Sequence, residues 1–339
     1  MKIVVDAFGG DNAPLAVLQG CAMAMQQDAN IQVLLCGDIA KMQACAADNG
    51  IDLSRMQLIQ ADEVFDMHDD PQEVLKSKAG TSLAVALQTL ANGAADAFVS
   101  AGSTGAVLVG ATFIVKRLKG IKRAALAPVM PSTGAPFLLI DCGANLHVRP
   151  EILVQFGMLG TVYMQKVMGV KNPRVGLLNN GTEDTKGGDM LVETYQMLKE
   201  SDLNFVGNIE ARDVPAGVCD VLVTDGFSGN IVLKLTEGVA TSFMGMFKQV
   251  LLKNTMTKLA AMMIKPGLKE LKKVLDYTEY GGAPLLGISK PVIKAHGSSN
   301  ANAIMHALFQ AEKFANTGVT AEIAARLQAT KGARTDADA

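Results

Sequence analysis

The sequence contains no tryptophan, and aromatic residues make up only 5% of its 339 residues. Acidic and basic residues nearly balance, so the formal net charge is only −2. A nucleic-acid-binding protein typically combines a basic surface with aromatic side chains on which bases stack, so this composition argues against nucleic acid as a partner. Because 49% of the residues are hydrophobic, we expect a folded globular protein with a large core.

Cysteine is scarce, and its spacing contains no pairing motif. The chain has five cysteines and no CxxC pair: Cys21, Cys36, Cys45, Cys142 and Cys219. An odd number of scattered cysteines argues against a disulfide framework and against a zinc site, and favours reduced thiols in a cytoplasm. The start of the chain reaches the carboxylate of Asp6 before a signal-length apolar run could form, and no later run is long enough to span a bilayer. We therefore expect a cytoplasmic protein.

Six short apolar runs are each followed by a loop rich in Gly, Ser, Asn and Asp. Runs and loops together cover residues 3–14, 97–105, 137–145, 175–188, 220–230 and 292–300. If the six runs are parallel strands of one sheet, all six loops emerge at the same carboxyl edge, where open α/β sheets bind ligands. In the fifth unit the loop 224–230 is followed at once by an apolar run with helical spacing. Its free backbone N–H groups and the helix dipole suit an anion such as phosphate.

Predicted strands alternate with predicted helices nearly throughout, which indicates the α/β class with a mostly parallel sheet. One exception is expected, because strands at 124–130 and 136–141 are separated by a short hairpin loop and so favour an antiparallel pair. We predict a single α/β catalytic domain over residues 1–328, followed by a disordered tail at 329–339, which is small and polar at its end.

Residues 243–276 form a basic and apolar segment that differs from the rest of the chain. Lysine recurs between Met, Leu, Phe and Ile, and Pro266-Gly267 is predicted to break the segment into two helices of a hairpin. Such a pair can pack on its own domain or on a second subunit. It can also lie on a membrane surface or bind an acidic protein partner. Its apolar run at 259–264 is too short to span a bilayer.

The loop motifs resemble those of the PlsX family, the bacterial phosphate acyltransferases of phospholipid synthesis. The motifs are, in chain order, DAFGGDNAP, AGSTGA, DCGAN, GLLNNGTEDTKG, GNIEARD, TDGFSGNIVLK, YGGAPLLG and AHGSSNANAI. The resemblance extends from Lys2 to about Phe314. Phe8, Cys142 and Thr182 depart from the family pattern, but none of the three removes a polar group that we assign to chemistry.

The resemblance implies conversion of acyl-[acyl carrier protein] and inorganic phosphate to acyl phosphate and free carrier protein, without a cofactor. It also implies a homodimer with a Rossmann-like three-layer α/β/α sandwich, similar to phosphotransacetylases and to the isopropylmalate dehydrogenase group. Family members associate peripherally with the cytoplasmic membrane, so the basic hairpin is expected to contact an anionic membrane surface.

Three residues are candidates for catalysis: Lys186, Asn230 and His296. Phosphate must be bound as an oxyanion and directed at a thioester carbonyl, which requires N–H donors and fixed cations. Lys186 and Asn230 would polarise the carbonyl, whereas His296 would act as general base or donate a hydrogen bond to phosphate. From the residues alone, Lys186 can also be a solvated loop lysine and His296 a structural histidine.

The residues expected to bind phosphate and substrate lie in the same loops. They are Asp6, Gly9, Gly10, Asn12, Ser103, Thr104, Asn145, Asn180, Asp225, Ser228, Gly229, Ser298, Ser299 and Asn300. Asp6, Asp11, Asp141 and Asp225 follow strands and can orient donors or brace loops. As an alternative they can hold Mg²⁺, although their spacing matches no metal signature and we expect no metal. An acyl-cysteine at Cys142 is a further alternative.

Three other functions remain open at this stage. A phosphotransacetylase-like enzyme would use acyl-CoA in place of the acyl carrier protein. A nicotinamide-dependent dehydrogenase shares the implied architecture, but the chain has no GxGxxG motif. A membrane-associated scaffold without catalysis would not need the polar residues that are present in all six loops.

Overall fold

The computed structural model describes residues 1–275 and 281–337, and these residues form two mostly parallel sheets. The first sheet has seven strands: β3 (Gln57–Gln60), β2 (Gln32–Gly37), β1 (Lys2–Asp6), β4 (Ala97–Ser100), β12 (Val292–Lys294), β11 (Ala283–Leu286) and β5 (Ala125–Leu126). The second has five: β6 (Val129–Met130), β7 (Phe137–Ile140), β10 (Val221–Val223), β8 (Val175–Asn179) and β9 (Phe205–Glu210).

The six strand-loop units are therefore divided between two sheets. The condition that all six lie in one sheet is not met, because β1, β4 and β12 lie in the first sheet whereas β7, β8 and β10 lie in the second. The chain passes from one sheet to the other between β5 and β6, which are separated only by Ala127 and Pro128. β5 pairs antiparallel with β11, and β6 pairs antiparallel with β7, which confirms the predicted antiparallel pair. The α/β class is confirmed.

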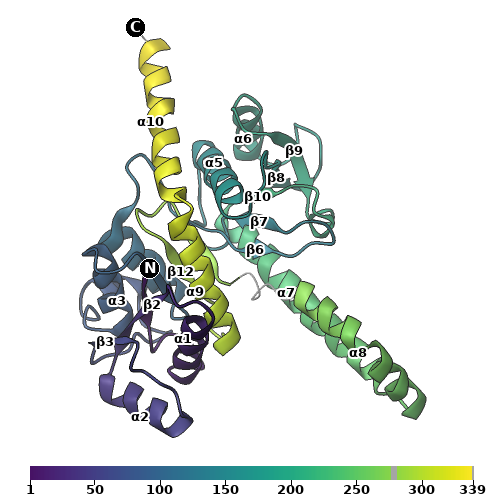
Figure 1. The fold of residues 1–339 in the computed structure, drawn as a ribbon. Coiled ribbons are helices and arrows are strands. Elements are labelled where there is room, and N and C mark those ends of the chain that lie inside the picture. The colour runs from purple at the N-terminus through teal and green to yellow at the C-terminus, as the bar shows by residue number, and fades with distance from the viewer. Residues whose placement is uncertain (276–280, 338–339) are drawn as a thin grey trace.

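Helices cover the sheets in layers, as Figure 1 shows. The α-helices are α1 (Leu15–Gln27), α2 (Ile39–Asn49), α3 (Ser82–Ala91), α4 (Thr104–Gly110), α5 (Pro150–Lys166), α6 (Asp189–Lys199), α7 (Gly226–Leu251), α8 (Thr255–Leu275), α9 (Ala301–Asn316) and α10 (Val319–Ala337). The short helices are η1 (Pro71–Leu75), η2 (Ala111–Lys116) and η3 (Val214–Ala216).

Successive side chains of β1 alternate between two hydrophobic cores, which explains why helices cover both faces of the first sheet. Ile3 and Val5 join a core with α1, α9 and α5, whereas Val4 joins a second core with α3 and α4. Successive side chains of a strand point to opposite faces, so this central strand is apolar on both sides, as expected for a parallel strand covered by helices. The first core continues to the second sheet, since Leu138 and Val221 belong to it.

The helical hairpin is longer than expected, and its turn lies elsewhere. α7 begins at Gly226, α8 continues across Pro266-Gly267, and the chain turns between Leu251 and Thr255. Here Asn254 Oδ1 accepts a hydrogen bond from Thr257 N at 3.0 Å, and Thr257 Oγ1 accepts one from Asn254 N at 3.0 Å. This reciprocal cap starts α8. The predicted break at Pro266-Gly267 was therefore wrong, and the predicted end at Asp276 lies outside the described residues. In Figure 1, α7 and α8 run side by side away from both sheets.

α10 extends to Ala337 and so covers most of the segment 329–339 that the sequence predicts as a tail. The second half of α10 repeats alanine, the strongest helix former, at positions 329, 333 and 337, which favours the continued helix. The last two residues lie outside the described part of the chain.

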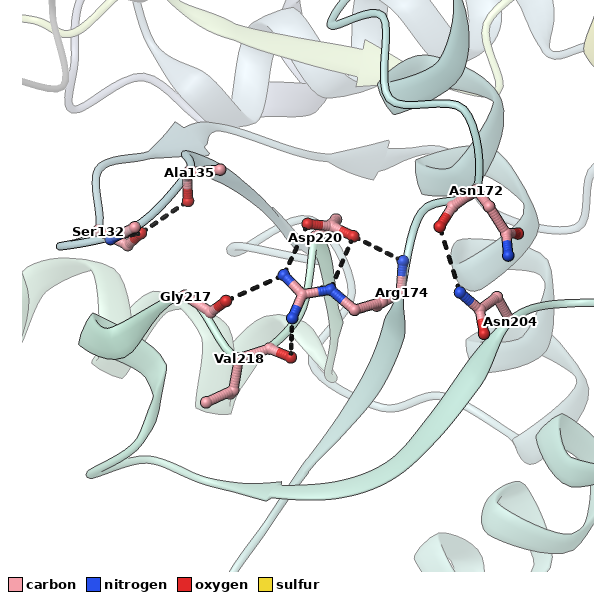
Figure 2. A network of polar contacts seen from close by, with 9 residues as sticks. Ser132, Ala135, Asn172, Arg174, Asn204, Gly217, Val218 and Asp220 are labelled. Carbon is pink, nitrogen blue, oxygen red and sulfur yellow. Dashed lines mark hydrogen bonds and ion pairs between the residues drawn. The ribbon is translucent and has the colours of Figure 1, made fainter.

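Arg174 and Asp220 brace the amino end of the second sheet (Figure 2). The Arg174 guanidinium donates to both carboxylate oxygens of Asp220, at 2.9 and 3.1 Å, and its backbone N–H donates to Oδ2 at 2.7 Å. The guanidinium also donates to the carbonyls of Gly217 and Val218, each at 3.0 Å. Asp220 directly precedes β10, so this network lies at the opposite end of the strand from the loop 224–230. It holds β10 in place without taking part in the site.

Candidate active site

A cavity of about 480 Å³ lies where the carboxyl ends of β12 and β7 meet the first turns of α7. Its ionisable lining residues are Asp11, Lys234, Glu237, Lys294 and His296. Thr104, Asn230 and Ser298 add uncharged polar groups. The apolar wall includes Met67, Leu126, Pro128, Val129, Cys142, Leu146, Phe227, Leu233 and Ala283. The cavity therefore combines two lysines and two carboxylates with an apolar wall.

Two glycines allow α7 to approach the loop after β7. A Cβ at Gly229 would lie 1.9 Å from the carbonyl oxygen of Asp141, and one at Gly226 would lie 2.8 Å from the backbone of Asn145. Asp225 caps the helix, because its Oδ1 accepts from Phe227 N and Ser228 N, each at 2.9 Å. The motif TDGFSGN thus places the first turn of α7, and with it Asn230, directly against the neighbouring loop.

Asp141 organises that loop. Its buried carboxylate accepts hydrogen bonds from the backbone N–H groups of Leu126 at 2.9 Å, Cys142 at 2.7 Å and Asn145 at 2.7 Å. Because Leu126 belongs to the first sheet, Asp141 ties the two sheets together at the cavity. Burial raises the pKa of Asp141, and its hydrogen bonds oppose this effect.

Asp6 plays the same role in the first sheet. Its carboxylate accepts from Ser82 Oγ at 2.6 Å and from Ser100 Oγ at 2.7 Å. A Cβ at Gly9 would lie 2.5 Å from Asp6 Oδ2, so the loop can pack here only with glycine. Burial raises the pKa of Asp6, against the effect of these hydrogen bonds. Asp6 and Asp141 are thus loop braces, as one of the two interpretations predicts.

The loops after β1 and β12 are joined by hydrogen bonds. Asp11 N donates to the carbonyl of Gly297 at 2.8 Å. Asn12 Nδ2 donates to the carbonyls of Ser298 at 3.1 Å and Ser299 at 3.2 Å. The segment 296–299 is therefore fixed from the side of β1, and His296 is held at the cavity.

Lys234, His296 and Glu237 form a connected group within the cavity. Lys234 Nζ lies 3.1 Å from Glu237 Oε2 and 3.4 Å from His296 Nε2, and His296 Nδ1 lies 2.8 Å from Ser298 Oγ. An ammonium group can only donate, so Lys234 requires the lone pair of His296 on Nε2. The backbone N–H of Ser298, however, donates to His296 Nδ1 at 3.2 Å, so both ring nitrogens face donors and these contacts do not fix the tautomer.

Two basic groups of the cavity are shifted toward their neutral forms. Burial lowers the pKa of Lys294 to about 8, aided by the charge of Lys234 and opposed by Asp6 and Asp11. Lys294 Nζ donates to the carbonyl of Ala101 at 3.3 Å and to that of Ala295. Burial, and then the charge of Lys234, also lower the pKa of His296, so its imidazole is neutral at pH 7.

The structure brings together some of the predicted site residues. Asn230, His296, Thr104 and Ser298 line the cavity. Others make contacts within the supporting loops, mostly with residues outside this set: Asp6, Gly9, Gly10, Asn12, Ser103, Asn145, Asp225, Ser228, Gly229, Ser299 and Asn300. Ser103 and Asn300 act as N-caps of α4 and α9. Their positions show how the site is built and leave their contact with substrate as a prediction.

Lys186 and Asn180 are not among the residues that line this cavity. Their loop follows β8, and β10 lies between β8 and β7, so the loop emerges one strand farther away. The Lys186 side chain is 47% exposed, with its Nζ 3.8 Å from Glu183 Oε1.

Sequence reasoning missed Lys234, Glu237 and Lys294. The first two follow Asn230 by four and seven residues on one helix, which places all three on one face. Lys294 ends a buried strand, where a charged residue is unusual. Both signals were present in the sequence.

Two alternative chemistries find little support in this geometry. Within residues 1–275 and 281–337, no three His, Cys, Asp or Glu side chains are close enough together to hold a metal ion. Burial raises the pKa of Cys142, and the charges of Asp141 and Glu237 raise it further. The thiol is therefore protonated, which disfavours a nucleophilic cysteine.

Comparison with known proteins identifies a matching family, similar sequences and a similar solved structure. The family described as "Fatty acid synthesis protein" matches residues 1–322. A phosphate acyltransferase from Bacillus licheniformis is 48% identical over 97% of this chain and 98% of its own length. One from Bacillus subtilis is 46% identical over 95% of this chain and 97% of its own length. Among solved structures, a phosphotransacetylase from Streptococcus pyogenes matches with a TM-score of 0.65 at 19% identity, over 93% of this chain and 94% of that one. The last likeness shows a shared fold.

Proposed function

The chain belongs to the fatty acid synthesis protein family, also known as PlsX, and on this premise we propose that it is a phosphate acyltransferase that converts an acyl thioester and inorganic phosphate to acyl phosphate. The observation that carries the proposal is the cavity in which Lys234 and Lys294 lie beside an apolar wall. Cations bind and orient the attacking anion, and the apolar wall suits the acyl group.

We propose that Lys234 and Lys294 bind phosphate and that the amide of Asn230 polarises the thioester carbonyl. An oxygen of phosphate forms a bond to the carbonyl carbon, and the C–S bond breaks. Its electron pair leaves with sulfur as a thiolate, which takes a proton from solvent. His296 Nε2 lies 3.4 Å from Lys234 Nζ, so we propose that the imidazole positions this ammonium; its predicted role as general base is untested. The role predicted for Lys186 from sequence is untested; because Lys186 does not line this cavity, we propose Lys234 in its place.

The proposed leaving group is the acyl carrier protein. Its acidic surface would match the basic residues of the site and hairpin. The experiment is to measure phosphate-dependent release of free thiol from a long-chain acyl carrier protein by the purified chain. Thiol release together with accumulation of acyl phosphate supports the proposal. Thiol release without phosphate would mean a thioesterase, and the absence of turnover would favour a scaffold.

Coenzyme A is the second candidate leaving group, because the neighbouring solved structures include a phosphotransacetylase. That likeness supports the fold alone, so the leaving group must be determined with substrates. Comparing kcat/KM for the same acyl group on coenzyme A and on the carrier protein separates the two. A preference for coenzyme A would overturn the proposed carrier-protein specificity and keep the phosphorolysis.

The hairpin is proposed to serve a homodimer and a peripheral membrane contact. One row of exposed apolar residues follows α7 at helical spacing: Phe227, Ile231, Leu235, Val239, Phe243, Met246 and Val250. Another group is exposed near the tip and on α8: Leu252, Met256, Leu259, Met262, Met263 and Ile264. Such faces are typical of protein or lipid contacts. Within the part of the chain that the structure describes, no helix combines the length and apolarity needed to cross a membrane.

Two measurements test these contacts separately. Light scattering at several protein concentrations gives the oligomeric state, which we expect to be a dimer. Cosedimentation with vesicles of anionic or neutral lipid tests the membrane contact, which we expect to require anionic lipid and to weaken with salt. A monomer, or equal binding to neutral vesicles, would refute the corresponding contact.

A further inference from the structure

A second cavity, of about 570 Å³, adjoins the candidate active site. Its apolar lining residues are Leu146, Val148, Met190 and Phe227, and its polar ones are His147, Asp225 and Ser228. Leu146 and Phe227 line both cavities, so these two side chains form the border between them. Each of the two is 60% exposed, and a molecule in either cavity can therefore reach them.

The backbone sets the position of this border. Gly226 N donates to the carbonyl of Asn145 at 2.8 Å, which joins the first turn of α7 to the loop after β7. Leu146 follows Asn145 and Phe227 follows Gly226, so this contact brings both apolar side chains to the same place. The polar residues beside them are already bonded to each other, because Ser228 Oγ donates to Asp225 Oδ2 at 2.8 Å. The second cavity therefore suits an apolar ligand.

The order of residues along α7 gives the direction in which an acyl chain can leave the carbonyl. Asn230, which we propose as the group that polarises the carbonyl, lies three residues after Phe227 and four before Lys234. Residues at these spacings are neighbours on one face of a helix. Toward the end of α7 the chain would cover the charged groups of Lys234 and Glu237, which is unfavourable because it removes water from them. Toward the start of α7 it meets Phe227.

We propose that the acyl chain of the thioester leaves the active-site cavity over Leu146 and Phe227 and enters the second cavity, where Val148 and Met190 contact its far end. This inference rests on the proposed function, and it assigns the path of the acyl chain and the residues that determine chain-length specificity. The apolar surface of Leu146 and Phe227 is covered when the chain binds. Each methylene that becomes buried should raise kcat/KM by about threefold to fourfold, until the second cavity is full.

The first test compares palmitoyl and butyryl acyl carrier protein in phosphate-dependent thiol release by the purified full chain. We expect the wild type to prefer the palmitoyl substrate by about 100-fold or more in kcat/KM. Phe227→Ser should reduce this preference by about 10-fold or more, whereas Phe227→Leu should keep most of it. Phe113→Ser is the matched control, because Phe113 is 64% exposed but lines neither cavity, and it should keep the wild-type preference. An equal loss on both substrates in Phe227→Ser would overturn the inference.

The second test locates the far end of the chain. Met190→Trp fills part of the second cavity, so kcat/KM should stop rising at a shorter chain length than in the wild type. In the wild type, a palmitoyl carrier protein with a diazirine at the end of the chain should label residues 146–148 or Met190 on irradiation, as mapped by mass spectrometry. Labelling of the hairpin at 243–275, or an unchanged chain-length limit in Met190→Trp, would overturn the proposed path.

A second copy of the chain is the competing occupant, because Phe227 also begins the exposed apolar row of α7. Light scattering on the same variants separates the two. A variant that loses the dimer but keeps its preference for the palmitoyl substrate would assign Leu146 and Phe227 to the subunit contact and overturn the inference. Phosphate-dependent thiol release that is equally fast for all chain lengths would refute the acyl path and leave the proposed function standing. The absence of such release with every chain length would refute both.

Discussion

Two lysine-glutamate pairs with the same spacing differ in what surrounds them. Lys234 and Glu237 line the cavity, with 3.1 Å between Nζ and Oε2, whereas Lys186 and Glu183 lie in an exposed loop, with 3.8 Å between Nζ and Oε1. The lysine side chains are similarly exposed, at 54% and 47%, but the glutamates are 16% and 60% exposed. The burial of the partner, and not the exposure of the lysine, therefore distinguishes the two pairs.

The difference has a direct electrostatic consequence. Interactions between charges are stronger where water is excluded, and exposed pairs are weakened by solvent and salt. Lys234 is also held by His296, which belongs to another strand-loop unit, so its ammonium has a defined position. Lys186 is fixed only through its backbone: its N–H donates to the carbonyl of Glu183, and its carbonyl accepts a hydrogen bond from Asn179 Nδ2. A catalytic cation requires a fixed position, which favours Lys234.

Replacing the two lysines in turn gives the largest expected effect. Lys234→Ala should lower kcat/KM for phosphate-dependent thiol release by about 10²- to 10³-fold, the range seen when one donor to a transition-state charge is removed. Lys186→Ala should change it by less than about threefold. Both variants should keep the wild-type circular dichroism spectrum. The reverse order of effects would restore the sequence-based assignment, and would mean that the loop of Lys186 reaches a cavity in its own chain or in a second copy.

Lys294 makes the pH dependence of the site asymmetric. Because its pKa is lowered to about 8, its ammonium is lost as the pH rises through that value, and phosphate binding should weaken above about pH 8. We expect kcat/KM for phosphate to fall by up to about tenfold per pH unit there. Lys294→Met should be weakly active and lack this limb of the profile. An identical limb in the variant would assign the ionisation to another group.

The lowered pKa of Lys294 weakens phosphate binding as the pH rises, but it makes the stability of the folded protein increase over the same range. The pKa of Lys294 is lower in the folded protein than the ordinary 10.5 of a lysine. Between about pH 8 and 10.5 the unfolded chain therefore binds more protons, and the contribution of Lys294 to stability rises with pH. Comparing the urea midpoints of wild type and Lys294→Met across this range isolates the contribution, which should be absent in the variant.

The sequence predicted the parts of the site that depend on local chain geometry. The loop 224–230 was expected to lead into a helix, and bracing of loops was one of the roles considered for Asp6 and Asp141, because turns and helix caps restrict which residues can occupy them. The division into two sheets could not be read in the same way. It depends on which strand each of β5 and β6 pairs with, and these pairings join residues distant in the chain.

The same limit explains why we propose Lys234 where the sequence predicts Lys186. Lys186 follows a strand within a polar motif, so it attracts a functional interpretation, but its distance from the cavity depends on the strand order β7-β10-β8. Lys234 lies in an ordinary helical stretch of the sequence, and only the folded structure brings its Nζ to 3.4 Å from His296 Nε2. The hairpin turn shows the reverse case, because proline dominated the sequence interpretation while the cap formed by Asn254 and Thr257 set the turn.

A polar network remote from the cavity should affect stability without affecting catalysis. Replacing Asp220 with Ala leaves the Arg174 guanidinium and its backbone N–H without their shared acceptor. We expect the free energy of unfolding to fall by about 1–3 kcal/mol. kcat/KM at a temperature where the variant is folded should stay within about twofold of the wild type, within the range of an ordinary surface change. A large kinetic loss in the folded variant would mean that the amino end of β10 is coupled to the site.

The smallest expected effect is that of the exposed pair itself. A double-mutant cycle on Glu183→Gln and Lys186→Met should give a coupling energy of no more than about 0.5 kcal/mol, since both side chains are largely hydrated. The coupling should decrease further in 0.5 M salt, because the screening length there is only about 4 Å. A coupling above about 1 kcal/mol that resists salt would show that this loop is more enclosed in solution, for example by a second copy of the chain. The contrast between the two lysine-glutamate pairs would then be one of location and no longer one of solvent exposure.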